Sequence, residues 1–390
     1  MTDLVTEPRL FRIDATDEQL ADLHRRLAET RWPDPEPVDD WSQGIPNAYV
    51  RELCDYWVDG YDWRAREANL NRFPQYIAPI SVQGCEPVDI HFIHARSPHP
   101  DATPLIMTHG WPGSVAEFQD VIDPLTDPTA HGGEPADAFH VVCPSLPGYG
   151  YSAKPRETGW GIERVAAAWV ELMALLGYDR FAAQGGDWGS MITTLLGSRH
   201  ADACTAVHLN MAVVLPSTLE DLTEAEKSCI ASFEDYQRWG SGYSTQQSTR
   251  PQTLGFGLAD SPAAQCAWIV EKFGAWTDNG DSDEPTLDRD RMLDNVMLYW
   301  LTNTGASSAR LYWESFKNPP FEVPQVPVGV SIFPAEIMRP SRRWSDAHYG
   351  DRLVWFGEPD RGGHFAAFEV PDLFVAEVRA SFAAIRAATG

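Results

Sequence analysis

The sequence has little cysteine, no long apolar run and a shortage of positive charge. Only six of its 390 residues are cysteines, and no two of them have the Cys-x-x-Cys spacing typical of metal-binding or redox motifs. We therefore expect reduced, mostly buried thiols and no metal site built from cysteine. The cysteines are Cys54, Cys85, Cys143, Cys204, Cys229 and Cys266.

Acidic residues outnumber basic ones by 56 to 30, which gives a formal net charge of -26 at pH 7. Such a charge opposes binding to phosphate backbones and anionic membranes, so nucleic acid is not an expected partner. No apolar run is long enough to cross a bilayer. Residues 1–8 also lack the basic flank and the apolar stretch of a secretion signal. We therefore expect a cytoplasmic protein without a membrane span.

Three histidines close together, His91, His94 and His99, resemble a metal site at first sight. They lie in a segment of alternating apolar pattern, with no carboxylate or cysteine at the usual ligand spacing. Strand and loop histidines are the better interpretation, and no bound metal is expected.

The most informative local pattern lies at residues 180–190, which read RFAAQGGDWGS. Its apolar start predicts the end of a buried strand, and the residues after the turn predict a helix. Gly185, Gly186 and Gly189 surround Asp187 with the spacing of a nucleophile elbow, where small neighbours allow a sharp turn. A carboxylate there can attack an electrophilic carbon and form an ester, and the helix N-terminus favours its charge. The alternative is that Asp187 only caps the helix.

The N-terminal part of the chain predicts helices that have one side to bury. A helix begins after Thr16 with leucines on one face, and a second helical stretch runs from about Pro46 to Ala68. Residues 1–87 therefore predict an N-terminal meander that wraps another domain.

From residue 88 strands and helices alternate, which predicts a mostly parallel sheet covered on both faces. The segment HGWPGS at 109–114 follows a buried strand, and its backbone N–H groups could point at an oxyanion. The alternation stops between 213 and 311, where helical patches separated by a polar stretch at 240–262 predict an inserted helical lid. The predicted divisions are 88–212 for the first part of the core, 213–311 for the lid and 312–390 for the second part of the core.

Two later residues complete a catalytic order. Glu336 and His364 each follow one of the two strands predicted after the lid, at 328–333 and 353–356. Nucleophile, acid and histidine occur in this order in α/β-hydrolases, each at the carboxyl end of a strand. Alone, either residue is better explained as an ordinary loop side chain; their joint appearance favours a triad. Glu358 and Asp360 are rival acids near His364, but neither directly follows the earlier strand.

Three segments resemble those of the microsomal-type epoxide hydrolases of the α/β-hydrolase superfamily. They read HGWPGS at 109–114, GGDWGS at 185–190 and GGHFAAFE at 362–369. Residues 8–115 also resemble the N-terminal domain of that family, so the resemblance spans nearly the whole chain. The membrane anchor of the animal members is not recognised.

The resemblance implies the roles of the site residues. Asp187 is the nucleophile, His364 the base and Glu336 the acid that orients it. Tyr243 and Tyr312 polarise the epoxide oxygen, with the alternative that both are packing aromatics among the 12 tyrosines of the chain.

The implied reaction opens the epoxide to an ester on the aspartate, which activated water then hydrolyses to a vicinal diol. The backbone N–H groups of Trp111 and Trp188 are the candidate donors to the oxyanion of the second step. No metal or organic cofactor is implied. The expected partners are a small-molecule epoxide substrate, water and, in a homodimer, a second copy of the chain.

Two alternatives from other classes stay open. A haloalkane dehalogenase uses the same aspartate elbow and binds its halide with N–H donors that are often tryptophan. Trp188 therefore favours a dehalogenase, whereas the tyrosines and the N-terminal domain favour an epoxide hydrolase. A non-catalytic binding protein of the same fold is opposed by the complete triad, and a serine esterase by the aspartate at the elbow. The 15 tryptophans suggest a pocket for a bulky epoxide, and the resemblance also permits a natural-product (polyketide or enediyne) epoxide.

Overall fold

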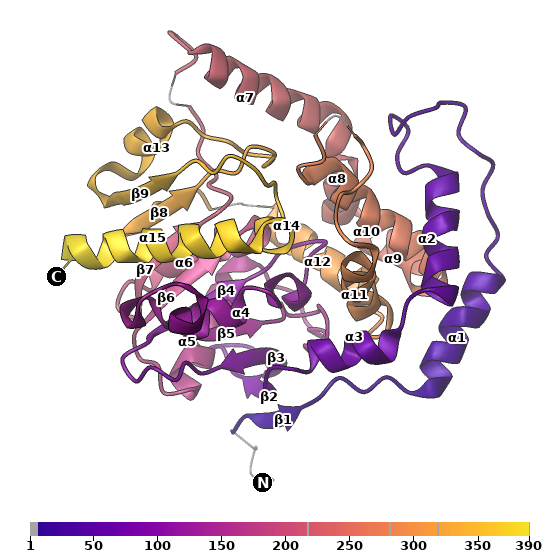
Figure 1. Cartoon of the computed structure of the whole chain (residues 1–390), viewed down its shortest axis with the longest axis horizontal. Helices are drawn as coiled ribbons and strands as arrows, with labels where there is room; N and C mark the ends of the chain where they lie inside the picture. The colour runs from indigo at the N-terminus through magenta and orange to yellow at the C-terminus, as the bar shows by residue number, and fades with distance from the viewer. Residues whose placement is uncertain (1–6, 217, 281, 318–319, 390) are drawn as a thin grey trace.

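A nine-stranded sheet forms the centre of the computed structural model, which describes residues 7–216, 218–280, 282–317 and 320–389 (Figure 1). The strand order is β1-β2-β3-β5-β4-β6-β7-β8-β9. Neighbours from β1 to β5 are antiparallel, whereas the six strands from β5 to β9 run parallel, as the sequence predicts. The strands are β1 (Arg9–Phe11), β2 (Gln75–Ile80), β3 (Val88–Ala95), β4 (Thr103–Thr108), β5 (Phe139–Pro144), β6 (Phe181–Gly185), β7 (Cys204–Leu209), β8 (Val328–Ser331) and β9 (Leu353–Gly357).

Helices cover the sheet in two layers. α5 packs on α6 in one layer, and α4 packs on α15 in the other. The central strands are therefore apolar along their length: Leu105, Ile106 and Met107, consecutive in β4, are all fully buried. These helices are α4 (Ile122–Thr126), α5 (Ile162–Leu175), α6 (Asp187–Arg199) and α15 (Pro371–Thr389), with α13 (Arg342–Tyr349) and α14 (Ala366–Glu369) in the last part of the chain.

The N-terminal segment wraps the outside of the molecule and reaches the lid (Figure 1). Its helices are α1 (Asp17–Ala28), α2 (Asn47–Asp59) and α3 (Trp63–Leu70). The sequence predicts one helical stretch from Pro46 to Ala68, but the structure has two helices there. The chain leaves α2 at Gly60, and Asp62 starts α3 by accepting the N–H of Ala65. Residues 1–6, which carry the secretion-signal argument, lie outside the described residues.

The lid is helical, as predicted, but it is more continuous than the sequence suggests. The polar stretch at 240–262, predicted to separate helices, itself contains α8 and α9. These two helices bury Tyr243, Gln247 and Leu258 and both contact α12, so tertiary packing outweighs their polar composition. The lid helices are α7 (Glu224–Asp235), the π-helical turn η4 (Tyr236–Gly240), α8 (Gly242–Thr249), α9 (Pro251–Asp260), α10 (Pro262–Trp276), α11 (Arg289–Trp300) and α12 (Gly305–Ser315). The predicted end of the lid at residue 311 falls inside α12.

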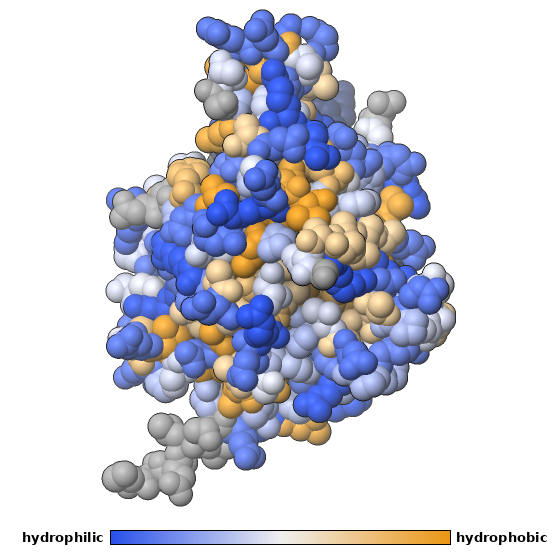
Figure 2. All heavy atoms as spheres, turned by 90° about the vertical axis from the view of Figure 1, so that its left-hand side faces the viewer, coloured by the Kyte–Doolittle hydropathy of each residue, from blue (hydrophilic) through white to orange (hydrophobic). Residues whose placement is uncertain are grey.

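An apolar groove lies beneath the projecting helix α7, on the face shown in Figure 2. Its volume is about 550 Å³, and Ile230 and Phe233 of α7 line it together with Ile337 and Trp344 of the core.

All six cysteines are free thiols, and four of them are buried. Within the described ranges no helix is both long and apolar enough to span a membrane.

Candidate active site

Asp187 lies at a sharp turn where β6 ends and α6 begins. Its φ of 49° is in the left-handed region, which a non-glycine residue rarely adopts. Gly185 and Gly189 permit the turn, because a Cβ on Gly185 would collide with the Gly189 carbonyl and one on Gly189 with the Thr108 carbonyl. The helix starts at Asp187 itself, so its N-terminus favours the negative charge of the carboxylate.

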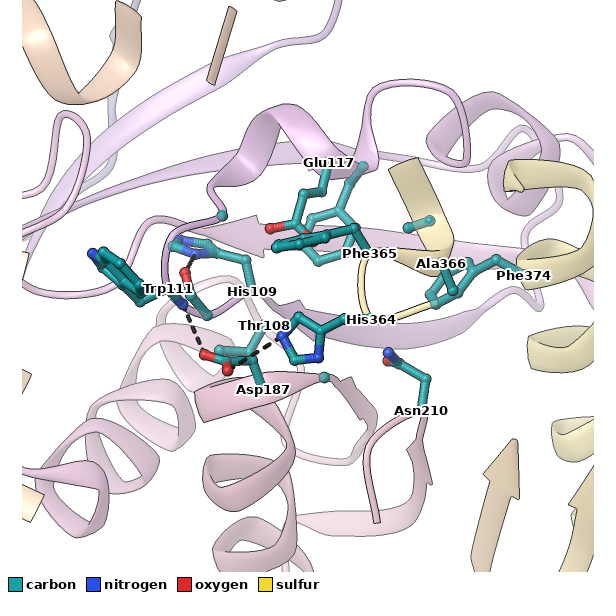
Figure 3. Close-up of a pocket in the computed structure, with 15 residues that line it drawn as sticks. Thr108, His109, Trp111, Glu117, Asp187, Asn210, His364, Phe365, Ala366 and Phe374 are labelled. Carbon is teal, nitrogen blue, oxygen red and sulfur yellow. Dashed lines mark hydrogen bonds and ion pairs between the residues drawn. The ribbon is translucent and has the colours of Figure 1, made fainter. Parts of the chain in front are cut away.

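His364 contacts both predicted carboxylates, and Figure 3 shows its contact with Asp187. Its Nδ1 lies 2.7 Å from Oε1 of Glu336, and its Nε2 lies 3.3 Å from Oδ2 of Asp187. The side chains of Glu336 and His364 are 0% and 2% exposed, whereas that of Asp187 is 16% exposed. The rival acids Glu358 and Asp360 are exposed. The structure thus brings together the three residues that the sequence predicts.

The two carboxylates control the charge of the imidazole. Burial alone would lower the pKa of His364, but the charge of Glu336 and the hydrogen bonds to Asp187 and Glu336 raise this pKa well above its usual value of 6.5. His364 is therefore protonated at neutral pH.

A backbone donor already points at the aspartate. The N–H of Trp111 donates to Oδ1 of Asp187 over 2.8 Å. Gly110 allows this approach, because a Cβ there would collide with the Asp187 carboxylate. The N–H of Trp188 belongs to the first turn of α6, where amides have no acceptor within the helix. Of the two predicted oxyanion donors, that of Trp111 is thus bonded to the Asp187 carboxylate, and that of Trp188 belongs to the next residue.

Residues from the lid hold the Trp111 loop, which the sequence analysis missed. Asn295 of α11 donates its Nδ2–H to the Pro112 carbonyl over 2.7 Å and accepts the Ser114 hydroxyl over 2.7 Å. Tyr299, one turn later, donates to the Gly113 carbonyl over 2.8 Å. No local motif could have revealed these contacts, because they join segments more than 180 residues apart.

The two predicted tyrosines converge on the tryptophans beside Asp187. The Tyr243 ring stacks on Trp111 with centroids 4.9 Å apart, and the Tyr312 ring meets Trp188 edge-on at 4.8 Å. The two tyrosine rings are 5.8 Å apart. Tyr236, which the sequence analysis did not single out, places its hydroxyl 3.1 Å from that of Tyr243.

Burial raises the pKa of Tyr243 and that of Tyr312 well above the usual value of 10, and the charge of Asp187 adds to the effect. Both hydroxyls therefore keep their protons at neutral pH and can donate hydrogen bonds. This is the property that a group facing a developing alkoxide requires.

The loop that carries His364 is fixed by contacts on both sides. The N–H of His364 donates to the Trp276 carbonyl over 2.9 Å. Glu369 accepts the N–H of Phe365 over 3.0 Å and that of Asp278 over 2.8 Å. Glu369 lies in the segment GGHFAAFE, but sequence reasoning gave it no separate role.

The described residues contain no group of three or more His, Cys, Asp or Glu side chains placed to hold a metal ion. His91, one of the three clustered histidines, is a buried residue of β3 bonded to Ser145 and Gln75. Its two ring nitrogens are 2.9 Å and 2.8 Å from these partners.

Comparison with protein families gives two matches. The "Epoxide hydrolase N terminus" family matches residues 8–118, and the "alpha/beta hydrolase fold" family matches residues 103–243. A protein of Stigmatella aurantiaca assigned to the epoxide hydrolases is 51% identical over 97% of this chain and 85% of its own length. Epoxide hydrolase 1 of Sus scrofa is 35% identical over 95% of this chain and 87% of its own length.

Solved structures agree with these relatives. The Aspergillus niger epoxide hydrolase superposes with a TM-score of 0.87 at 34% identity, covering 97% of each chain. The juvenile hormone epoxide hydrolase of the silkworm Bombyx mori gives a TM-score of 0.88 at 29% identity, covering 99% of this chain and 96% of its own. These matches confirm the predicted α/β-hydrolase fold and do not support the dehalogenase or binding-protein alternatives. The chain belongs to the epoxide hydrolase family, whose enzymes add water to an epoxide.

Proposed function

We propose that the chain hydrolyses its epoxide through a covalent ester on Asp187. In the first step Oδ2 of Asp187 attacks one epoxide carbon, and the bond from that carbon to the ring oxygen breaks. Oδ1, which accepts the Trp111 N–H, becomes the ester carbonyl oxygen. The hydroxyls of Tyr243 and Tyr312 hydrogen-bond the ring oxygen, and one of them gives its proton to the alkoxide.

The proton on His364 balances this step. His364 releases it to water, and water returns a proton to the tyrosine that protonated the alkoxide. Once Asp187 is an ester, one of the two negative charges that raise the pKa of His364 has gone. The imidazole is then neutral and can act as a base.

In the second step water attacks the ester carbonyl carbon and loses a proton to Nε2 of His364. The negative charge formed on Oδ1 is stabilised by the N–H groups of Trp111 and Trp188. The ester C–O bond then breaks, and the departing alkoxide takes the remaining proton of the former water to give the diol. The Asp187 carboxylate and the protonated His364 are restored.

One observation carries this proposal, which is the contact of a single imidazole with both carboxylates. Glu336 fixes the ring through Nδ1 over 2.7 Å, so Nε2 is turned toward Asp187. A histidine held in this way can take a proton from a water at Asp187.

A trapped intermediate tests the mechanism. We expect His364→Gln to form the ester but not to hydrolyse it, so that intact-mass measurement after exposure to an epoxide shows the protein plus one substrate. Asp187→Ala is the matched control and should show no added mass. Absence of the adduct from His364→Gln, with an epoxide that the parent enzyme turns over, would remove the ester mechanism.

The apolar groove beneath α7 supports a bulky, apolar epoxide as the substrate. Phe233 lines the groove and stacks on Tyr236 with ring centroids 6.1 Å apart, and Tyr236 reaches Tyr243. On the core side the groove is lined by Ile337, the residue after Glu336. A substrate body in this groove would thus be linked to Tyr243 through the rings of Phe233 and Tyr236.

A panel of epoxides tests this substrate class. Styrene oxide, epoxyoctane, a polycyclic arene oxide and a polyene natural-product epoxide should be turned over with kcat/KM rising with apolar size. Preference for the smallest member would contradict the proposal.

We also infer a cytoplasmic location and a homodimer. The free state of all six cysteines fits a reducing compartment. Leu219 and Trp239 are 68% and 73% exposed, which fits an apolar contact surface. Light scattering on the purified chain should give twice the monomer mass of 43.4 kDa.

A further inference from the structure

A small cavity lies beside the Asp187–His364 pair (Figure 3). Its volume of about 20 Å³ is enough for about one water molecule. Asp187, His364, Glu117 and Asn210 line it with polar groups, and much of the remaining lining is apolar. The cavity therefore joins the ester position, the base and one further carboxyl group.

Glu117 presents its carboxyl group to this cavity from the short helix η1 (Val115–Phe118). Figure 3 shows it across the cavity from the Asp187–His364 pair. Its Oε1 accepts the N–H of Ser114 over 3.1 Å, and Oε2 makes no hydrogen bond to any of the described residues. Gly113 admits the carboxyl group, because a Cβ at that position would collide with it.

Two other polar side chains at the cavity each use one atom in a hydrogen bond to the protein. Oδ1 of Asn210 accepts from Gln184 over 2.8 Å, and the hydroxyl of Thr108 accepts from Trp169 over 3.1 Å. A buried water needs two to four polar partners. Glu117 and His364 can each supply one of them, and Asn210 also lines the cavity.

We propose that Glu117 positions the water that hydrolyses the ester on Asp187, by binding it in this cavity beside Nε2 of His364. The inference rests on the covalent mechanism proposed above and adds a residue to its second step only. Glu117 makes no covalent bond to the reacting carbon, so it is a positioning residue.

The protonation state of Glu117 fits this role. Burial raises its pKa to about 8. The charge of His364 opposes this increase, and the charge of Asp187 adds to it. The carboxyl group is therefore mostly protonated at pH 7, and its hydroxyl can donate to the water. The water in turn donates to His364 and keeps one lone pair for the ester carbon.

The test separates the two chemical steps by rapid mixing and quenching, with the epoxide of the panel that the parent enzyme turns over fastest. In Glu117→Ala we expect the ester to form within about threefold of the parent rate and to be hydrolysed about 10- to 100-fold more slowly. Glu117→Asp, which withdraws the carboxyl group by one methylene, should show the same split. Glu117→Gln keeps both hydrogen bonds and should recover most of the hydrolysis rate.

Glu369→Gln is the matched control. Glu369 is also a buried carboxyl group near His364, and its pKa is raised by burial to about 7, but it is not among the cavity residues. We expect it to change both rates by the same factor.

Hydrolysis at the parent rate in both Glu117→Ala and Glu117→Asp would overturn the inference. So would equal slowing of both steps, which is the result expected if Glu117 only supports the Trp111 loop. If Glu117→Ala does not fold, Glu117→Asp decides. Failure of the ester mechanism is seen separately, as the absence of an adduct in His364→Gln.

Discussion

At the scale of single residues, the surroundings of each catalytic group set its protonation state. His364 is buried and would be neutral without its two carboxylate neighbours, whereas the tyrosines keep their protons because they are buried near Asp187. Each group is thus in the protonation state that the first step requires before a substrate arrives. The same side chains would have different pKa values in water.

Replacing Tyr312 tests the division of labour between the steps. Tyr312→Phe should slow ring opening by about 10²-fold, because one donor to the alkoxide is lost. Ester hydrolysis should change little, since the phenol hydroxyl has no part in it. The two rates can be read from pre-steady-state traces of one reaction, and equal slowing of both would contradict this role.

At the scale of elements, Glu226 joins helix α7 to the segment that starts α13. It accepts from the Ser341 hydroxyl over 2.7 Å and from Nη2 of Arg343 over 2.6 Å, and it also closes the N-terminal cap of α7 through Thr223. The Ser341 hydrogen bond, with those of Thr223 and Arg343, lowers the pKa of Glu226 to about 2. These contacts hold the N-terminal end of α7, the helix at the top of Figure 1.

Glu226→Gln should lower the Tm at pH 7, because the ion pair with Arg343 is lost. The pKa of the carboxylate is lower in the folded than in the unfolded chain, so its contribution is complete above about pH 4.5 and is lost as the pH falls toward about 2. The difference in Tm between parent and variant should therefore shrink between pH 5 and pH 3. Thermal melts over this range are the measurement, and a difference that grows on acidification would refute the assignment.

At the scale of the whole molecule, the N-terminal segment is fastened to the lid by a buried ion pair. Arg66 of α3 contacts both carboxylate oxygens of Asp294 on α11, with Nη2 2.5 Å from Oδ2. Tyr61 donates to the same carboxylate over 2.8 Å. Asp294 precedes Asn295, which holds the Trp111 loop. The wrapping segment thus supports the active site through one lid helix.

Removing one partner of the Arg66–Asp294 ion pair should lower the free energy of unfolding more than removing both. Asp294→Leu leaves the Arg66 guanidinium without its partner in a partly buried position, and we expect a loss of about 3 kcal/mol in the free energy of unfolding. Combination with Arg66→Met should recover part of this loss, since no unpaired charge remains. Urea unfolding of the two single variants and the double variant measures the coupling, and additive losses would show that the pair does not interact.

The sequence by itself determines the features that depend on neighbouring residues. The glycines around Asp187 specify the turn, the apolar strands specify a buried parallel sheet, and the order of Asp187, Glu336 and His364 along the chain indicates a triad. Each of these patterns acts over a few residues, or repeats with the period of a strand or helix, so it is visible without coordinates.

Only the tertiary structure decided which distant groups meet. It brought Glu336 rather than Glu358 or Asp360 to the histidine, turned Glu117 toward the cavity and placed Asn295 against the Trp111 loop. It also made helices of the polar stretch 240–262, whose composition predicts none. These outcomes depend on burial and hydrogen bonding between segments far apart in the chain, and local spacing carries no record of them.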